Sequence, residues 1–356
     1  MQVRGNVCII TLSEDPLNIL SRDVRVSLRS RLDLAVNDTL VKCIVLTGSS
    51  TAFSVGADIN EFISSTYSST PIPDSWQYCK NAENHQLSSS DVHTPHEEDN
   101  LLRLSHLIDT CPKPCLAFIC GYCFGGGLEL ALACHYRIGL SGSQYRFPET
   151  LIGLQPGAGG TQLLPRFIPF DLAIKMCFGQ CLTLSCHSAM TNGLIDQEIQ
   201  IQKFETITNQ INFLVDRINY FLLEHQNISK QFPWQRSSTK PLKTDLRDAT
   251  YMINQALAQI SSKKFTEKYN SFANRNVLKS LYNAVKYSSR FEAGIKLESD
   301  IFRRLMNSFE SQSLCWIFLA ERKNSRTSRL RSGIVEGTHG RGHRVDRRCT
   351  AEPLAP

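Results

Sequence analysis

A glycine-rich segment near the middle of the chain has the residues of an oxyanion-binding turn. Gly121–Leu130 contains Gly125, Gly126 and Gly127 and follows an apolar run. Glycine lets a ligand approach the backbone because no Cβ stands in the way. A helix that begins at this triplet would offer unpaired N–H donors and a partial positive charge at its N-terminus. Such donors stabilise negative charge developing on a carbonyl oxygen.

Two glutamates accompany such turns. Glu129 lies three residues after Gly126 in an otherwise apolar stretch. A buried carboxylate there is energetically unfavourable unless it is paired or protonated, which suggests a functional role. The alternative is that Glu129 only stabilises the helix through its interaction with the helix dipole. Glu149 follows Pro148 and precedes the turn at 156–161. A Pro-Glu pair at a helix start is common, so Glu149 alone is ambiguous.

The elements that must position these residues can be read from the apolar pattern. Val7–Leu12 and Lys42–Thr47 are β-branched apolar runs that predict buried strands. Between them, Val24–Val36 has apolar residues at helical spacing, with Ser21 or Asp23 as its cap, so the three form a βαβ unit. A further turn and helix start are predicted within Ala52–Glu61, after the second strand.

In the rest of the chain, predicted strands and helices alternate at first, and only helices are predicted after that. We expect strands at 115–120 and 136–140, and helices at 101–108, 126–135, 162–178 (broken by Pro165 and Pro169), 204–223, 248–260 and 276–318. The polar stretch 64–99 predicts a surface insertion or a disordered loop. The predicted organisation is a core at 1–200 with that insertion, a helical region and linker at 201–321, and a basic disordered tail at 322–356.

Charge is concentrated in that tail. The chain has 356 residues and a net charge of +6; residues 322–356 hold nine Lys/Arg and three Asp/Glu, and the preceding 321 residues balance. The body is therefore not a nucleic-acid-binding surface on charge grounds. An RNA-binding or acid-binding tail is the alternative to a solvated one, but the tail has no interleaved aromatic residues.

The cysteines indicate a reducing compartment. There are thirteen, an odd number, and we expect reduced thiols packed as small apolar residues. Cys120-x-x-Cys123 lacks a second pair at ligand spacing, which disfavours a metal site. Cys115–Cys134 has the length of a membrane span but carries Glu129 and the glycine triplet, so a strand, a turn and a buried helix are predicted instead.

Together these segments resemble the enoyl-CoA hydratase/isomerase (crotonase) family. The resemblance rests on Ala52–Glu61, Lys113–Arg137 and Tyr145–Arg166, in that order, and on Pro16–Leu20 near the N-terminus. It implies an α/β fold, the ClpP/crotonase spiral of ββα units, with a helical C-terminal region. It also implies an enoyl-CoA hydratase of fatty-acid β-oxidation, with isomerase activity as an additional expectation.

The resemblance assigns roles by position. The N–H groups of Ala57 and Gly126 would form the oxyanion hole for the thioester carbonyl, and Glu129 and Glu149 would share the proton transfers. The substrate would be an acyl-CoA thioester, with no cofactor and no metal. Asn60 stands where many members carry a Lys near the CoA phosphates, and His135 replaces the usual Asp, an exchange expected to be structural.

The second half resembles the helical linker of the peroxisomal bifunctional type, in which a hydratase half precedes a 3-hydroxyacyl-CoA dehydrogenase half. The stretches are Phe291–Glu298 and Phe318–Lys323. No GxGxxG occurs in the sequence, so no dehydrogenase activity is expected. A peroxisomal location follows by resemblance only, because the chain ends Leu354-Ala355-Pro356 rather than in an S-K-L signal; the cytoplasm is the alternative.

Two alternatives to a hydratase stay open at this point. A catalytically impaired scaffold and another CoA-thioester enzyme of the same fold both fit the overall pattern. A homo-oligomer is also among the expected assemblies, since many members are trimers or hexamers. Neither a nucleic-acid partner nor a membrane span is expected.

Overall fold

The computed structural model describes residues 1–12, 15–63, 100–200, 236–266 and 271–336, and also 209, 212, 213, 216 and 269. The chain divides into two compact units, residues 1–315 and 316–356. The first unit holds both sheets and the site. The predicted insertion at 64–99 and almost all of the predicted helix at 204–223 lie outside the described residues.

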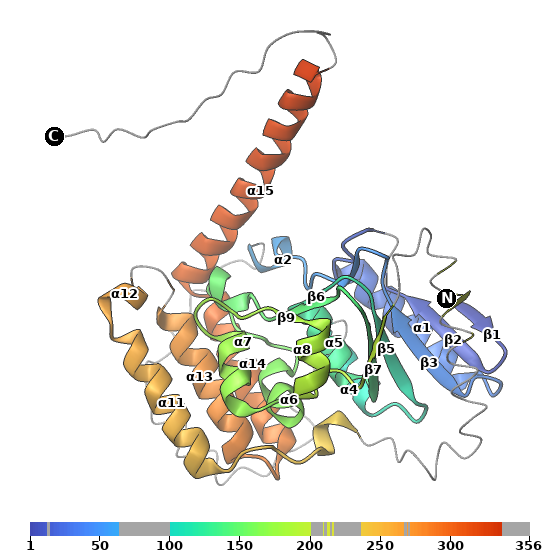
Figure 1. Cartoon of the computed structure of the whole chain (residues 1–356), viewed down its shortest axis with the longest axis horizontal. Helices are drawn as coiled ribbons and strands as arrows, with labels where there is room; N and C mark the ends of the chain where they lie inside the picture. The colour runs from blue at the N-terminus through green and yellow to red at the C-terminus, as the bar shows by residue number, and fades with distance from the viewer. Residues whose placement is uncertain are drawn as a thin grey trace. The chain divides into compact units, whose positions relative to one another are not determined.

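Two sheets form the body of the first unit (Figure 1). The larger has the order β1-β2-β3-β5-β7-β10, in which only the pairing of β1 with β2 is antiparallel. The smaller has the order β4-β6-β8-β9, antiparallel only between β8 and β9. The strand bounds are β1 Gln2–Arg4, β2 Val7–Thr11, β3 Cys43–Thr47, β4 Ala52–Ser54, β5 Cys115–Ile119, β6 Tyr122–Phe124, β7 Tyr136–Leu140, β8 Gln144–Arg146, β9 Leu184–Ser185 and β10 Gln197–Ile199.

The chain winds through these sheets as a repeating unit. Each repeat adds one strand to the larger sheet, then one to the smaller sheet, and then a helical segment: β3-β4-α2, β5-β6-α5, and β7-β8-η1. The predicted spiral of ββα units is confirmed, as is the βαβ unit formed by β2, α1 and β3. These helices are α1 Arg22–Asn37, α2 Asn60–Ile63, α4 Leu101–Asp109, α5 Gly126–Ala133 and the 3₁₀ helix η1 Glu149–Ile152.

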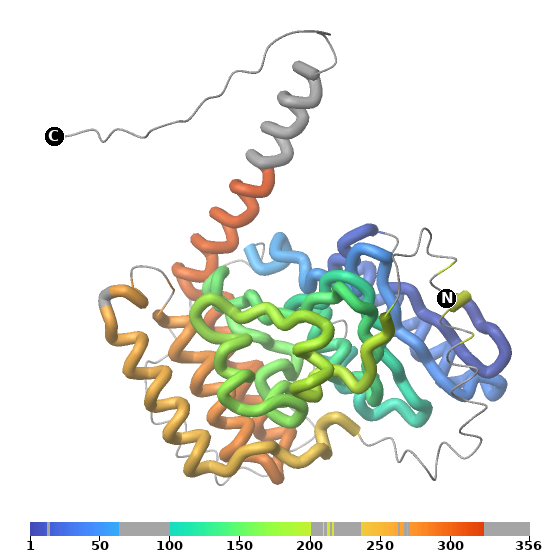
Figure 2. The backbone as a smooth tube through the Cα atoms, in the orientation of Figure 1, coloured from blue at the N-terminus to red at the C-terminus, as the bar shows by residue number. Residues whose placement is uncertain are grey.

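A layer of C-terminal helices packs on this spiral. In both views α11, α13 and α14 lie side by side, and α13 and α14 contact α6 (Figures 1 and 2). The bounds are α6 Gly160–Phe167, α7 Phe170–Cys177, α8 Cys186–Asn192, η2 Ser237–Thr239, α11 Leu246–Ile260, α12 Lys263–Thr266, α13 Ser271–Lys286, α14 Phe291–Met306 and α15 Phe309–Glu336. Helices α11–α14 thus belong to the same compact unit as the sheets.

Two sequence expectations differ from the structure. The predicted break at Pro165 is wrong, since α6 runs through Pro165 to Phe167. The break comes at Pro169, because a residue before proline avoids the helical region, and Ile168 is extended. The tail predicted to be disordered from Arg322 is helical to Glu336. Its Arg, Lys, Leu and Glu residues favour a helix without any apolar period. Residues 337–356 lie outside the described part.

The transmembrane-like segment folds as predicted. Residues 115–134 form β5, β6 and the buried helix α5. No described helix is long and apolar enough to cross a membrane. The six cysteines expected to pack as small apolar residues are buried in the core: Cys111, Cys115, Cys134, Cys177, Cys181 and Cys186.

Arg137 is the largest fully buried side chain, and its partners anchor β7. Its Nε donates to Leu194 O at 3.0 Å, Nη1 to Cys134 O at 2.7 Å, and Nη2 to Asp196 Oδ2 at 2.7 Å. The guanidinium also stacks on the Phe167 ring, 4.1 Å from its centroid. Removing one partner of such a buried network leaves the others unpaired.

Arg137→Met should therefore lower the free energy of unfolding by about 3–5 kcal/mol. Urea unfolding at neutral pH measures this. Arg275→Met on the exposed surface of α13 is the matched control and should change stability by less than about 0.5 kcal/mol. Equal losses in the two variants would contradict the anchoring role.

Candidate active site

Two turns bring a pair of backbone N–H groups together. Gly56 and Ala57 follow β4, and Gly126 opens α5 directly after β6. A Cβ placed on Gly56 would lie 3.2 Å from Gly126 N, and one placed on Gly126 would lie 3.6 Å from Ala57 N. The parallel pairing of β4 with β6 thus sets the two turns next to each other.

Both N–H groups are available to a ligand. Gly126 is the first residue of its helix, so its N–H has no intrahelical acceptor. In the described turns and loops, neither Ala57 N–H nor Gly126 N–H donates to a backbone oxygen. Two such donors beside one cavity can polarise a carbonyl group and stabilise an enolate-like oxyanion.

Glu129 lies on the first turn of α5 and is 3% exposed. Its Oε1 accepts hydrogen bonds from Ala158 N at 2.7 Å and Gly160 N at 2.9 Å. Burial raises the pKa of Glu129 to about 7, although the hydrogen bonds from Ala158 and Gly160 work in the opposite direction. Glu129 therefore changes charge near neutral pH, which suits a general base.

Glu149 is the first residue of η1 and lines the same cavity. Among the described residues, its buried Oε2 has no hydrogen-bond partner. Burial, followed by the charge of Glu129, raises the pKa of Glu149 well above its ordinary value, while Arg146 lowers it. A carboxyl group that is raised in this way holds its proton more readily than a free one, which suits a general acid.

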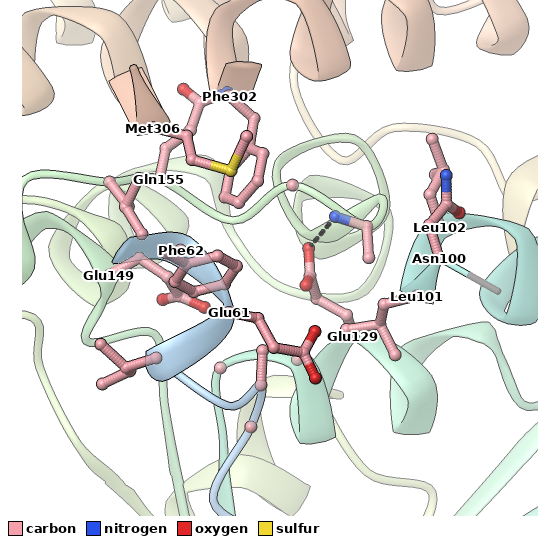
Figure 3. A pocket seen from close by; sticks show the side chains of 18 of the residues that line it. Glu61, Phe62, Asn100, Leu101, Leu102, Glu129, Glu149, Gln155, Phe302 and Met306 are labelled. Carbon is pink, nitrogen blue, oxygen red and sulfur yellow. Dashed lines mark hydrogen bonds between the residues drawn. The ribbon is translucent and has the colours of Figure 1, made fainter. Parts of the chain in front are cut away.

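The cavity has a volume of about 350 Å³, and all four residues predicted for the site line it. Figure 3 shows Glu129 and Glu149 on either side of it, with Phe302 and Met306 of α14 above. Apolar side chains suited to an acyl chain complete the lining: Phe62, Leu101, Ile152, Leu154, Phe302 and Met306. The insertion at 64–99 lies outside the described residues, but Phe62 before it and Asn100 after it both line the cavity.

A third buried glutamate was missed by sequence reasoning. Glu298 of α14 is 0% exposed and hydrogen-bonds the same glycine-rich turn that holds Glu129. One signal could have found it: Glu298 stands with Gly294, Ile301 and Leu305 at the spacing of a buried helical stripe. An acid at such a position needs hydrogen-bond partners in the core.

The comparison with protein families decides the assignment. The sequence model described as enoyl-CoA hydratase/isomerase matches residues 7–310. The chain belongs to this family. The crotonase fold expected from the resemblance is confirmed, because a crystal structure of an enoyl-CoA hydratase from Mycobacterium avium subsp. paratuberculosis superposes with a TM-score of 0.54 at 18% identity, covering 90% of this chain and 94% of that one.

Longer relatives resemble nearly the whole chain. The peroxisomal bifunctional enzyme of Pongo abelii is 29% identical over 331 residues, which are 92% of this chain but 38% of that protein. The glyoxysomal fatty acid beta-oxidation multifunctional protein of Cucumis sativus is 28% identical over 321 residues, 90% of this chain and 39% of its own length. This member of the enoyl-CoA hydratase/isomerase family thus spans about two fifths of the length of these two relatives.

The departures from the family pattern have local explanations. His135 accepts a hydrogen bond from Cys115 N through Nδ1 at 2.9 Å, and its Nε2 lies 3.2 Å from Asp109 O. Burial lowers the pKa of His135, so a neutral ring that donates from Nε2 fits both contacts. This is the expected structural role. The side-chain amide of Asn60 donates to Asp58 Oδ1 at 2.7 Å.

The cysteine pair at 120 and 123 has no features of a metal or redox site. Burial raises the pKa of Cys120 to about 11 and that of Cys123 well above its ordinary value, so neither is a ready thiolate. The part of the chain that the structure describes contains no group of three His, Cys, Asp or Glu side chains that could hold a metal ion.

Proposed function

We propose that this chain is an enoyl-CoA hydratase that adds water across trans-2-enoyl-CoA to give 3-hydroxyacyl-CoA. One observation carries the proposal: two buried carboxyl groups, each with a raised pKa, line one apolar cavity together with two available N–H groups. Membership of the enoyl-CoA hydratase/isomerase family supports CoA-thioester chemistry in this cavity. A hydratase needs one acid to take a proton and another to give one, and it needs a site for an oxyanion.

The residues divide the reaction as follows. Ala57 N–H and Gly126 N–H polarise the thioester carbonyl, which makes C3 electrophilic. Glu129, ionised near neutral pH, takes a proton from water as the oxygen bonds to C3. Glu149, which keeps its proton, delivers it to C2 as the enolate collapses. Water is added overall, and the proton taken by Glu129 is then transferred to Glu149, directly or through solvent, which restores both groups.

The test is direct. Purified chain is mixed with a short trans-2-enoyl-CoA, and the loss of the conjugated enoyl absorbance is followed. Turnover supports the proposal. A folded protein that binds the thioester without turnover would instead favour a scaffold, the alternative that keeps the fold but not the chemistry.

The pH dependence of kcat/KM should report both acids. The rate should fall about tenfold per pH unit below about pH 7, because Glu129 then carries the proton that it must accept. It should also fall at high pH, where Glu149 loses the proton that it must donate. A profile that is flat from pH 5 to pH 8 would contradict this assignment of base and acid.

A second activity has an observation in its favour. Because both acids can hold or release a proton, one can remove a proton from C2 while the other protonates C4 of the same dienolate. This would give Δ3-to-Δ2 enoyl-CoA isomerisation in the same cavity. The same variants that abolish hydration should then abolish isomerisation of a 3-enoyl-CoA.

The biological setting is proposed from the relatives' names. They are peroxisomal and glyoxysomal proteins, one of them named for fatty-acid β-oxidation. We infer the same pathway and organelle for this chain, with an acyl-CoA thioester as its partner and no cofactor needed for hydration. Dehydrogenation of the product is not expected from the residues present.

A further inference from the structure

Glu298 reaches the active-site turn from a distant helix. Its Oε1 accepts from Gly159 N at 2.7 Å, and its Oε2 accepts from Thr161 N at 2.9 Å. The Thr161 hydroxyl makes a third hydrogen bond to Oε2. A fully buried carboxyl group is therefore satisfied entirely by one turn of backbone and its hydroxyl.

The amides of this turn alternate between two acids. The N–H groups of Ala158 and Gly160 point to Glu129, while those of the residues between and after them point to Glu298. The alternation needs the left-handed backbone of Gly159, whose φ is +102°. A Cβ on residue 160 would lie 2.8 Å from Glu129 Oε1, so glycine alone allows this approach.

Further polar contacts fix α14 against the turn. Gln155 Nε2 donates to Glu298 O at 3.1 Å, and Ser280 Oγ of α13 donates to Gln155 Oε1 at 2.9 Å. A Cβ on Gly294 would come within 2.3 Å of Gln162 Oε1, so α14 packs closely on α6. These contacts hold α14 against the turn.

The charges around Glu298 are few and of known sign. Burial, and then the charge of Glu129, raises the pKa of Glu298 to about 8. The hydrogen bonds from Thr161 and Gly159 work in the opposite direction and favour the ionised form of Glu298. The other titratable or charged groups that act on these acids are Glu149, Arg146 and Cys177.

We propose that Glu298 is a positioning residue, which holds Gly159 and Thr161 so that the N–H groups of Ala158 and Gly160 stay aimed at Glu129. The inference rests on the proposed hydratase mechanism at one point only, which is the role of Glu129 as the base. The two hydrogen bonds from Ala158 and Gly160 favour the ionised form of Glu129. Without Glu298 to hold the turn, these bonds weaken and Glu129 becomes a poorer base at neutral pH.

Graded substitutions test the kinetic consequence. Glu298→Met removes every acceptor and should lower kcat/KM at pH 7 by roughly 10–100-fold, since small misplacements carry such costs. The acid limb of the pH profile should move up by about one unit, the equivalent of one hydrogen bond. The kcat/KM of Glu298→Gln, which keeps one acceptor oxygen, should lie between the values of Glu298→Met and wild type. Glu292→Gln, exposed on the same helix, is the control and should behave as wild type.

A purely structural role predicts a different result. It would lower the rate or the stability equally at every pH and leave the acid limb in place, and that outcome would overturn the proposal. A downward shift of the limb would also overturn it, because repulsion between the acids would then outweigh the positioning.

A measurement without turnover separates this proposal from the hydratase assignment. Amide hydrogen exchange by NMR should be at least about tenfold faster at Ala158 and Gly160 in Glu298→Met, as expected when their hydrogen bonds open more often. In wild type, the amide shifts of Gly159 and Thr161 should respond to pH as Glu298 changes charge, and those of Ala158 and Gly160 as Glu129 changes charge. This wild-type titration stands even if both variants fail to fold. Amides of Gly159 and Thr161 that do not respond to pH, or unchanged exchange at Ala158 and Gly160 in a folded variant, would sink the proposal, whereas an inactive wild type would count only against the hydratase.

Discussion

Glu149→Gln should lower the hydration rate of a short trans-2-enoyl-CoA by roughly 1000-fold or more, within the range of general acid catalysis. Glutamine has nearly the same shape as protonated glutamic acid, so the variant keeps the packing around η1. It loses only the proton that Glu149 holds by virtue of its burial and of the charge on Glu129. Since Oε2 has no partner among the described residues, no structural hydrogen bond is removed there.

The change should appear in kcat rather than in binding. The oxyanion donors at Ala57 and Gly126 remain, so the thioester should bind with a similar dissociation constant. Steady-state kinetics at pH 7 measure kcat, and a titration with a non-reactive acyl-CoA measures the dissociation constant. Glu310→Gln, an exposed acid at the start of α15, controls for the general loss of a carboxyl group. A variant that retains a tenth of wild-type activity would remove Glu149 from the mechanism.

Much of the fold follows from local patterns along the chain. The strand at 43–47 and the helix at 22–37 were predictable because apolar residues repeat at the period of each element. The four residues proposed for the site were named from the family resemblance, which rests on glycine-rich turns and acids in a fixed order along the chain, and all four line one cavity. Local sequence sets local geometry, and the parallel pairing of the small sheet then joins the turns.

What was missed depends on contacts between distant segments. Glu298 meets Thr161 across 137 positions of sequence, and no local pattern specifies which turn a helix will cover. The helical character of 322–336 was missed for the opposite reason. Its Arg, Lys, Leu and Glu residues favour a helix by intrinsic propensity, whereas the prediction relied on the absence of an apolar period.

Glu129→Gln should also abolish hydration, by roughly 100- to 10,000-fold, because glutamine cannot take a proton from water. Its side-chain oxygen can still accept from Ala158 N and Gly160 N, so the turn at the start of α6 should stay in place. The matched kinetic measurement is the one used for Glu149, and the expected loss is in kcat. Residual activity that still rises with pH through 7 would mean that another group is the base.

The same variant should show how much the raised pKa of Glu129 changes the free energy of unfolding as the pH rises. The pKa of Glu129 is raised from 4.5 to about 7, so the native state binds more protons than the unfolded state between these values. The free energy of unfolding must then fall as pH rises, by about 3 kcal/mol for this group at 1.36 kcal/mol per unit. Glu149 and Glu298 are shifted in the same direction and add to the loss. Urea unfolding at pH 5 and pH 8 should therefore show wild type losing stability, and Glu129→Gln losing about 3 kcal/mol less. If both proteins lose the same amount, Glu129 is not held in the protonated form by burial, and its assignment as a base poised at neutral pH fails with it.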